Sequence, residues 1–296
     1  MTSQRDTQTK FVIITPVRNE EALVHQTIES VISQTVRPAE WVIVNDGSTD
    51  RTAEILEWYS CQYRWIQVIQ RKNRGYRKSG GGVIEAFNDG YAALRCWDWG
   101  FVVKLDGDLS FGPHYFQKCF EYFESEPRLG LGGGVIYNLM PDGTHKFESG
   151  GPTFHVRGAT KIYRRECWED IGGLWPAPGW DTLDEVKANM QGWTTRNFSN
   201  LHLLQHRITG GTDGSWRNLV KNGRANHFSG YHPFFMLAKC LSRILRRPYV
   251  AGSLALAYGF LTGYLKCTPQ VDDPELIAYL RRQQLARLRG GQTIWR

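Results

Sequence analysis

The chain lacks the features that identify a small module held together by metal or disulfides. Its 296 residues include six scattered cysteines, and none of them forms a Cys-x-x-Cys pair. This argues against a zinc module and against a disulfide framework. The polar first ten residues lack an apolar signal region, so the expected location is the cytoplasm. The length allows a substantial core, in one large domain or in one domain with an appendage.

Acidic residues are scarce in the last quarter of the chain. Residues 221–296 hold 12 Lys and Arg against 3 Asp and Glu, whereas residues 1–220 hold 24 against 26. The whole positive excess therefore lies in the last quarter. No nucleic-acid-reading module accompanies it, so nucleic acid is not expected as a partner. An anionic membrane surface is the better candidate, which would place the protein at the cytoplasmic face of a membrane.

Short apolar runs alternate with helical periods along the first 105 residues. The runs predict strands at 11–14, 41–44, 65–69 and 101–105, and the periods predict helices at 20–33, 52–59 and 79–94. This alternation indicates an α/β fold with a mainly parallel, doubly wound sheet. Further on, the sequence predicts glycine-spaced short strands over 130–151 and helices at 164–171, 184–190, 233–247 and 274–289.

Polar clusters follow three of the predicted strands. They are Thr15-Pro16, Asn45-Asp46 and Asp106-Gly107-Asp108. In doubly wound sheets, ligands bind beyond the carboxyl ends of the strands. Two carboxylates two residues apart can face one Mg²⁺ or Mn²⁺ ion that carries substrate phosphates. Asp-Gly is also ordinary turn chemistry, and the coincidence of three clusters favours the metal–nucleotide interpretation over the turn.

Read together, residues 15–21 (TPVRNEE), 44–50 (VNDGSTD) and 105–108 (LDGD) resemble the inverting glycosyltransferases of family 2. The resemblance extends over about residues 10–210. It implies a GT-A fold, a Rossmann-like doubly wound and mostly parallel sheet. The catalytic domain would span 1–220, with a nucleotide-sugar half at about 10–110 and an acceptor half at about 111–220. Residues 221–296 would form a helical, basic and apolar C-terminal extension that is associated with the membrane.

The resemblance also implies roles for single residues. Asp106 and Asp108 would hold Mg²⁺ or Mn²⁺ on the donor diphosphate, and Asp46 would accept a hydrogen bond from the nucleotide base. His206 stands where many members carry a histidine that helps to hold the metal or diphosphate, although it could equally be a partly buried histidine. The remaining residues of the expected donor site are Thr15, Pro16, Arg18, Glu20, Arg74 and Arg77, where the two last arginines could also be solvated loop charges.

A later acidic motif of the family supplies the catalytic base. Counting back from Gly192 places Asp181 at that position, where it would take the proton of the acceptor hydroxyl and invert the anomeric centre. The acid expected before it is Trp180, a departure from the pattern. Asp184 and Glu185 are close enough to leave the choice between Asp181 and Asp184 open, and Asp181 could also simply cap the helix that follows.

The expected function is the transfer of one sugar from a nucleotide-sugar donor, with UDP favoured, to a glycan or lipid-linked acceptor. Such a reaction belongs to the synthesis of cell-surface polysaccharide or glycolipid. The Gln-x-x-Arg-Trp signature of processive synthases is absent. One alternative is a sugar-phosphate nucleotidyltransferase, which is expected to carry a Gly-rich, basic loop after its first strand. The other is a non-catalytic nucleotide-sugar-binding membrane scaffold.

Residues 248–265 run for 18 positions without a charge. Glycine, serine and threonine dilute the hydrophobicity of this segment, which is near the minimum length for a spanning helix. Basic residues flank both ends, so charge asymmetry gives no orientation. Three alternatives follow: a spanning helix, an interfacial or re-entrant segment, and a helix packed on the catalytic domain. The basic flanks favour attachment to an anionic lipid surface.

Overall fold

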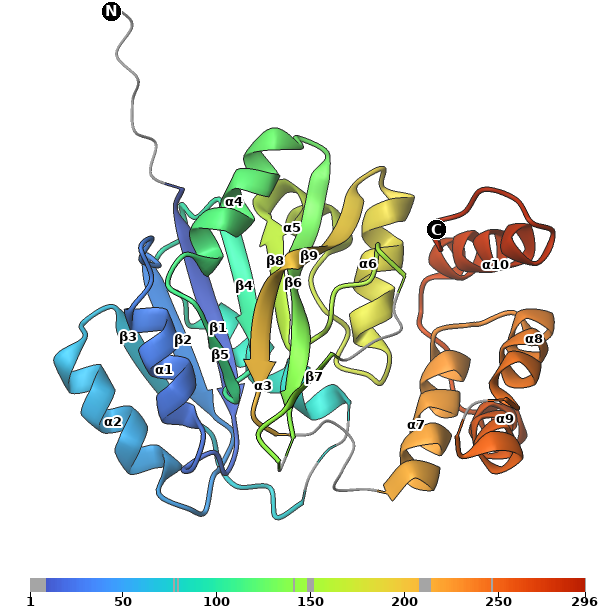
Figure 1. The fold of residues 1–296 in the computed structure, drawn as a ribbon, viewed down its shortest axis with the longest axis horizontal. Coiled ribbons are helices and arrows are strands. Elements are labelled where there is room, and N and C mark those ends of the chain that lie inside the picture. The colour runs from blue at the N-terminus through green and yellow to red at the C-terminus, as the bar shows by residue number, and fades with distance from the viewer. Residues whose placement is uncertain are drawn as a thin grey trace, which may run out of the picture.

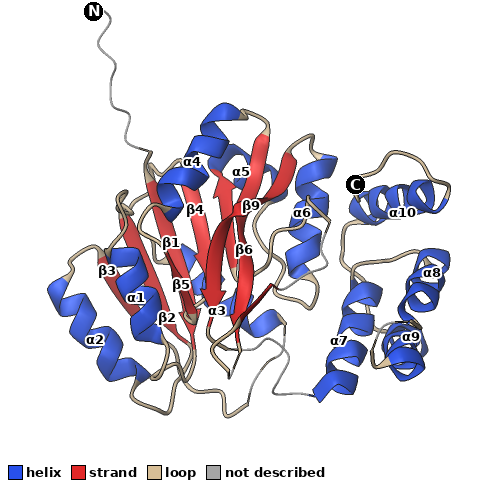
Figure 2. Ribbon diagram, in the orientation of Figure 1, coloured by secondary structure: helices blue, strands red, loops and turns tan. Residues whose placement is uncertain are grey.

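The computed structural model describes residues 9–76, 78, 80–140, 142–147, 152–207, 214–245 and 247–295. A nine-stranded sheet forms its centre, with strand order β3-β2-β1-β4-β8-β6-β9-β5 and with β7 paired to β6 (Figure 1). Helices cover both faces of the sheet. A further group of helices, formed by the last part of the chain, lies beside it (Figure 2). The expected doubly wound α/β architecture is confirmed.

The first half of the sheet is parallel. It contains β1 (Phe11–Val17), β2 (Glu40–Asn45), β3 (Ile66–Gln70) and β4 (Phe101–Leu105), connected by α1 (Val24–Ile32), α2 (Thr52–Gln62) and α3 (Gly81–Ala92). All four predicted strands and all three predicted helices are present. The carboxyl ends of these parallel strands therefore share one edge of the sheet.

The second half is mixed. β8 (Thr160–Arg164) runs antiparallel to β4 and to β6 (Leu129–Leu139), and β9 (Thr194–Gln205) runs parallel to β6. The other elements of this half are β5 (Leu109–Phe111), α4 (Tyr115–Ser125), β7 (His145–Phe147), α5 (Arg165–Ile171) and α6 (Trp180–Met190). The helix predicted at 184–190 thus begins four residues earlier, which puts Asp181 in its first turn.

The short strands predicted over 130–151 are found only in part: β7 is a strand of three residues, but β6 is one strand of 11 residues. Its glycines let neighbouring backbones come close without interrupting it. A Cβ on Gly133 would lie 2.6 Å from the Thr160 carbonyl oxygen, and one on Gly134 would lie 2.5 Å from the Leu201 carbonyl oxygen. The glycine spacing therefore reflects close approach between strands and not turns.

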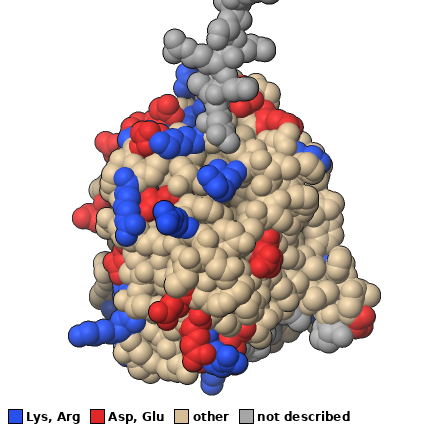
Figure 3. Space-filling model, turned by 90° about the vertical axis from the view of Figure 1, so that its left-hand side faces the viewer, with Lys and Arg blue, Asp and Glu red and all other residues tan. Residues whose placement is uncertain are grey.

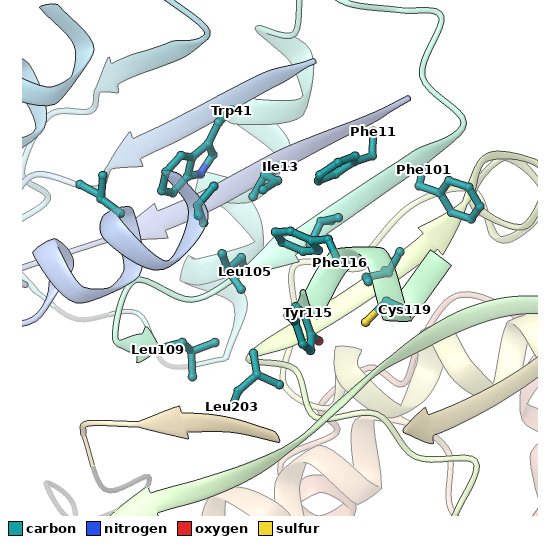
Figure 4. Close-up of a cluster of buried hydrophobic side chains, with 14 of the residues drawn as sticks. Phe11, Ile13, Trp41, Phe101, Leu105, Leu109, Tyr115, Phe116, Cys119 and Leu203 are labelled. Carbon is teal, nitrogen blue, oxygen red and sulfur yellow. The ribbon is translucent and has the colours of Figure 1, made fainter. Parts of the chain in front are cut away.

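Two apolar clusters, one on each face, hold the helices to the sheet. On one face, alternate residues of β1 pack with α1, α2 and α4, as the close-up of Phe11, Ile13, Phe116 and their neighbours shows (Figure 4). On the other face, Val12 and the alternate residues of β2 pack against α3, α5 and α6. The period of two along each strand is what a sheet covered on both sides requires.

Four helices make up the C-terminal group. They are α7 (Gly214–Phe228), α8 (Pro233–Arg243), α9 (Tyr249–Leu265) and α10 (Pro274–Leu288), placed beside α6 (Figure 1). The expected division at 220/221 lies inside α7. α7 and α9 approach closely, since a Cβ on Gly259 would lie 2.1 Å from the Val220 carbonyl oxygen. Lys187 of α6 pairs with Asp273 at 2.5 Å, which joins the start of the last helix to the α/β part of the molecule.

α9 contains most of the uncharged segment at 248–265. Among the residues with described coordinates, no helix combines the length and the apolarity that crossing a bilayer requires. α9 packs against α7 and α8, and only part of its surface is buried.

Candidate functional site

An open pocket of about 600 Å³ lies beyond the carboxyl ends of β1, β2 and β4. We call it the donor pocket. It brings together seven of the residues predicted for the donor site, namely Pro16, Arg18, Glu20, Asp46, Arg74, Asp106 and Asp108. Thr15 is buried beneath them, and its hydroxyl accepts a hydrogen bond from the Trp41 indole at 2.9 Å. Arg77 lies outside the described residues.

The Asp46 carboxylate is held by arginines. Arg71 donates to Oδ1 at 2.6 Å and Arg74 donates to Oδ2, while Arg18 donates to the Asp46 carbonyl oxygen at 3.2 Å. Arg71 was not predicted. It follows β3 directly, and its amide donates to the Asn45 carbonyl oxygen at 2.9 Å, which brings it level with Asp46. The rule that ligands bind at strand ends would have found it, had it been applied to the third strand.

The two aspartates after β4 differ in their surroundings. Lys104 donates to Asp106 Oδ1 and to the Gly158 carbonyl oxygen. Asp108 is buried, and its Oδ2 accepts a hydrogen bond from Gln205 at 3.2 Å. Its Oδ1 is also buried, with no partner among the residues described. Burial, reinforced by the charge of Asp106, raises the pKa of Asp108 to about 6.

Glu20 is the third acid on the same side of the pocket. Burial raises its pKa to about 8, against the lowering effect of Arg207, and Asp108 and Asp106 raise it further. Arg207 pairs with Glu20 at 2.8 Å. Sequence reasoning missed Arg207, although it stands two residues after the end of β9, where a strand-end search would have included it.

These acids suit a hard divalent cation. Carboxylate oxygens are what Mg²⁺ and Mn²⁺ prefer, and the unpartnered Oδ1 of Asp108 has a lone pair to offer. Within the described part of the chain, no group of three or more His, Cys, Asp and Glu is arranged to hold a metal by itself. Phosphate and water oxygens would therefore have to complete the coordination, as is common for Mg²⁺.

His206 is close to Asp108 through its backbone, because its amide donates to the Asp108 carbonyl oxygen at 3.0 Å. Its ring is engaged elsewhere, with Nε2 at 2.8 Å from the Ser110 hydroxyl. Burial lowers the pKa of His206, and nearby His145 lowers it further. The structure thus brings His206 beside the aspartates without adding its ring to the residues that line the donor pocket.

Asp181 lines a second pocket of about 490 Å³, between α6 and the C-terminal helices. Two residues, Gly158 and Lys104, connect it to the donor side. A Cβ on Gly158 would lie 3.3 Å from Asp181 Cβ, and the Gly158 carbonyl oxygen accepts from the same Lys104 that pairs with Asp106. Asp181 therefore stands on a wall between the two pockets.

The other two acids of this motif are fully buried. Lys161 Nζ lies 2.8 Å from Asp184 Oδ2 and 2.9 Å from Glu185 Oε1, and it also donates to the Asp181 carbonyl oxygen at 2.7 Å. Asp184 accepts a further hydrogen bond from Tyr163 at 2.6 Å. These contacts tie the first turns of α6 to β8, and neither Asp184 nor Glu185 lines a pocket described here.

Trp180 occupies the place where the sequence pattern led us to expect an acid. Its ring is buried, and the Lys104 and Lys161 ammonium groups each lie 5.4 Å from its centroid. The face of an indole attracts a cation, so the tryptophan can take over part of the charge compensation that an acid would give.

A family model, described as "Glycosyl transferase family 2", matches residues 12–175. The uncharacterized glycosyltransferase EpsJ of Bacillus subtilis is 37% identical over 130 residues, which are 44% of this chain and 35% of that protein. Glycosyltransferase GlyA of Streptococcus pneumoniae is 39% identical over 186 residues, 56% of this chain and 26% of that protein. The chain thus spans about a third or less of the length of these relatives.

Two solved structures resemble the fold over nearly the whole chain. The mannosyltransferase PcManGT from Pyrobaculum calidifontis, in complex with GDP-Man and Mn²⁺, has a TM-score of 0.55 at 15% identity, with 96% of this chain and 76% of that chain covered. GalNAc-T7 with UDP, GalNAc and Mn²⁺ has a TM-score of 0.62 at 14% identity, with 98% and 56% covered. At such identities the likeness supports the GT-A fold alone.

Proposed function

Because the chain belongs to glycosyl transferase family 2, we propose that it is a metal-dependent inverting glycosyltransferase that moves one sugar from a nucleotide-sugar donor, UDP favoured, to an acceptor. The acceptor would be a glycan or a lipid-linked unit of cell-surface polysaccharide or glycolipid synthesis. One observation carries the proposal: the donor pocket gathers residues from three strand ends, and four of them, Glu20, Asp46, Asp106 and Asp108, are acids with raised pKa values or a cationic partner.

The donor would lie across the strand ends. Asp46, held by Arg71 and Arg74, would face the nucleotide base, and the arginines would neutralise diphosphate oxygens. Asp106 and Asp108 would hold Mg²⁺ or Mn²⁺, which acts as a Lewis acid on the leaving diphosphate when bound. PcManGT and GalNAc-T7 are both described with Mn²⁺, which supports a divalent cation here.

Asp181 would be the general base. It is partly exposed on a pocket wall, whereas Asp184 is fully buried and bonded to Lys161 and Tyr163. A base must reach the hydroxyl whose proton it takes, so accessibility favours Asp181. Lys161 is a positioning residue, since it fixes the backbone of Asp181 from beneath.

The base is tested with Asp181→Asn. We expect transfer to fall by about 10²–10⁴-fold, the usual contribution of a general base. Donor binding, measured by calorimetry with Mn²⁺, should stay within about two-fold because Asp181 does not line the donor pocket. Unchanged transfer in this variant would refute the assignment and favour a non-catalytic scaffold.

The donor and metal are tested by thermal shift with UDP-, GDP- and dTDP-sugars, each with and without Mn²⁺. Stabilisation should appear with one base and require the cation, and Asp106→Ala should abolish the effect of the cation. Equal stabilisation by all donors without metal, unchanged in Asp106→Ala, would overturn the site.

We also propose that the protein works at an anionic membrane surface and docks there through α8 and α9. Large apolar side chains are exposed along one face of each helix, among them Phe234 (68% exposed), Leu241 and Leu245 (85% exposed) near α8, and Leu254, Tyr258 and Leu261 on α9. Soluble proteins rarely expose contiguous patches of this kind without a partner.

The charge around this face favours a lipid surface over another protein as its partner. Residues 214–271 contain eight Lys and Arg and no Asp or Glu. By contrast, the side of the molecule that carries α2 and β3 shows acidic and basic residues interspersed (Figure 3). Each basic residue near an anionic bilayer contributes about 1 kcal/mol, in addition to the burial of the apolar face.

Vesicle sedimentation tests the membrane. Binding should require anionic lipid, be released by high salt, and fall at least about ten-fold in Leu254→Glu/Leu261→Glu. Trp58→Glu, an equally exposed apolar residue on α2, is the control and should bind like the wild type. Retention through both salt and alkali would contradict peripheral attachment.

A further inference from the structure

The second pocket differs from the donor pocket in the balance of its charged side chains. Its polar lining comes from residues 155–182 and from the C-terminal part of the chain, namely His155, Arg157, Asp181, Thr182, Asn222, Asn226, Ser229, Tyr231, Lys239, Ser242 and Arg243. Among the described lining residues Asp181 is the only carboxylate, against one lysine and two arginines. The cavity is thus polar and positively charged.

Two of these cations have no carboxylate to balance them. Lys239 Nζ lies 3.4 Å from Asn226 Oδ1 and 5.1 Å from the centroid of Tyr231. Arg243 Nε is buried without a hydrogen-bond partner. Neither side chain forms an ion pair with an acid in the described part of the chain. Burial lowers the pKa of Lys239 to about 8, and Arg243 lowers it further, as expected for a desolvated cation beside another cation.

Partly buried cations without a counter-charge are costly, and an anionic ligand that enters the pocket would balance them. The remaining lining groups suit a phosphate ester, since Ser242, Ser229 and the two asparagines offer hydroxyl and amide donors. The neighbouring acid is Asp181, the base assigned above, so a molecule bound here lies beside the group that would take its proton.

We propose that this pocket, between α6 and the helices α7 and α8, is an acceptor site that binds the phosphate of a phosphorylated acceptor through Lys239 and Arg243. The inference rests on the proposed function, because it names the class of acceptor that the transferase uses. The apolar face of α8 and α9 adjoins the pocket, as Lys239, Ser242 and Arg243 lie on the same helix as exposed Leu237 and Leu241. A lipid phosphate could therefore place its chain in the membrane and its phosphate in the pocket.

Calorimetry on the full chain tests the proposal with three probes: inorganic phosphate, farnesyl phosphate and farnesol. Phosphate-bearing probes should bind, and Lys239→Met should weaken them at least about ten-fold, because a charge-assisted hydrogen bond is lost. Asn226→Asp is a second variant, which places a carboxylate beside Lys239 without changing the side-chain shape and should weaken the same probes. Arg224→Gln removes an exposed charge of α7 outside the pocket and should bind like the wild type.

The probes separate the two sources of phosphate. Farnesyl phosphate bound at least ten-fold more tightly than inorganic phosphate would indicate a lipid-linked acceptor, and equal affinities would indicate a soluble phosphorylated one. Either result supports the site. Farnesol bound as well as farnesyl phosphate, or equal phosphate binding by wild type, Lys239→Met and Asn226→Asp, would overturn it. If Arg224→Gln also loses phosphate binding, the binding is a non-specific attraction of charge, and the proposal is overturned.

Nucleotide-sugar binding with Mn²⁺ is measured in parallel on the same variants. If donor binding is intact and phosphate binding fails, this inference falls and the proposed function stands. If phosphate binds and no nucleotide-sugar does, the proposed function falls, and the assignment of the anion to an acceptor falls with it.

Discussion

The donor pocket and the second pocket stand on either side of one wall and differ in how their charges are balanced. Glu20, Asp46, Asp106 and Asp108 line the first together with Arg18, Arg74, Lys78 and Arg207, whereas Asp181 is the single acid among the described residues that line the second. The wall itself is short, running from Asp106 through Lys104 and Gly158 to Asp181. In the donor pocket three of the acids pair with basic side chains: Asp46 with Arg74, Asp106 with Lys104, and Glu20 with Arg207. Lys239 and Arg243 of the second pocket pair with no acid in the described part of the chain, so this pocket is suited to an anionic ligand.

The two pockets also come from different parts of the chain. The acids of the donor pocket lie within residues 12–175, which match the family. Asp181 and all the lining residues from α7, α8 and α9 lie beyond that segment. The pocket proposed for the donor therefore belongs to the sheet, whereas the pocket proposed for the acceptor is built largely by the helices that follow the sheet in the chain.

The largest effect on stability is expected from Lys161, which contacts Asp184, Glu185 and the Asp181 carbonyl oxygen. Lys161→Met would leave Asp184 and Glu185 buried without their cation, which costs about 3–5 kcal/mol for a broken buried pair. Urea unfolding measures this loss in the free energy of unfolding. Lys118→Met, on the exposed side of α4, is the control and should change it by less than about 0.5 kcal/mol. If both variants lose similar amounts of unfolding free energy, the two pockets do not depend on the contacts of Lys161 with Asp184 and Glu185.

A smaller effect is expected from an acid of the donor pocket. Asp108→Asn keeps the shape of the side chain and can still accept the hydrogen bond from Gln205. It removes the negative charge that the carboxylate, with its unpartnered Oδ1, would offer to a cation. Mn²⁺-dependent donor binding should weaken by about 10–100-fold. Phosphate binding in the second pocket should be unchanged in the same variant. Equal weakening of both would mean that the pockets are not independent.

The sequence predicted the donor pocket better than the second one, for a physical reason. Parallel strands of a doubly wound sheet all end at one edge, so Pro16, Asp46 and Asp106 could be placed together from their positions after apolar runs. Arg71 and Arg207 were missed, although they also follow strands. Their partners, Asp46 and Glu20, are more than 20 residues away in the chain, and no local pattern indicates such pairs.

The second pocket could not be predicted in this way. A helical period at 233–247 and an uncharged run at 248–265 indicated the segments of α8 and α9, but not how these helices pack. The cavity depends on α7 lying against α9, where Gly223 and Gly259 allow the two backbones to touch. Glycine spacing in a helix has many causes, so only the tertiary structure brings Lys239 and Asp181 into the lining of one pocket.

The smallest effect concerns the stability cost of the unpaired lysine. The folded-state pKa of Lys239 is about 8, below its ordinary value of 10.5, so the unfolded chain holds this proton more strongly. The cost is present in full below pH 8 and disappears as the pH rises to about 10.5.

Lys239→Met should therefore be more stable than the wild type by about 1 kcal/mol at pH 7, a value reduced because the residue is only partly buried. The difference should vanish near pH 10.5, where Lys239 is neutral in most folded molecules. Denaturant unfolding of the two proteins across this range measures it, with Arg224→Gln as the charge-matched control. A variant less stable than the wild type at pH 7 would mean that the contacts of Lys239 with Asn226 and Tyr231 outweigh the cost of the missing counter-charge, and the second pocket would then lose the unbalanced charge that sets it apart from the donor pocket.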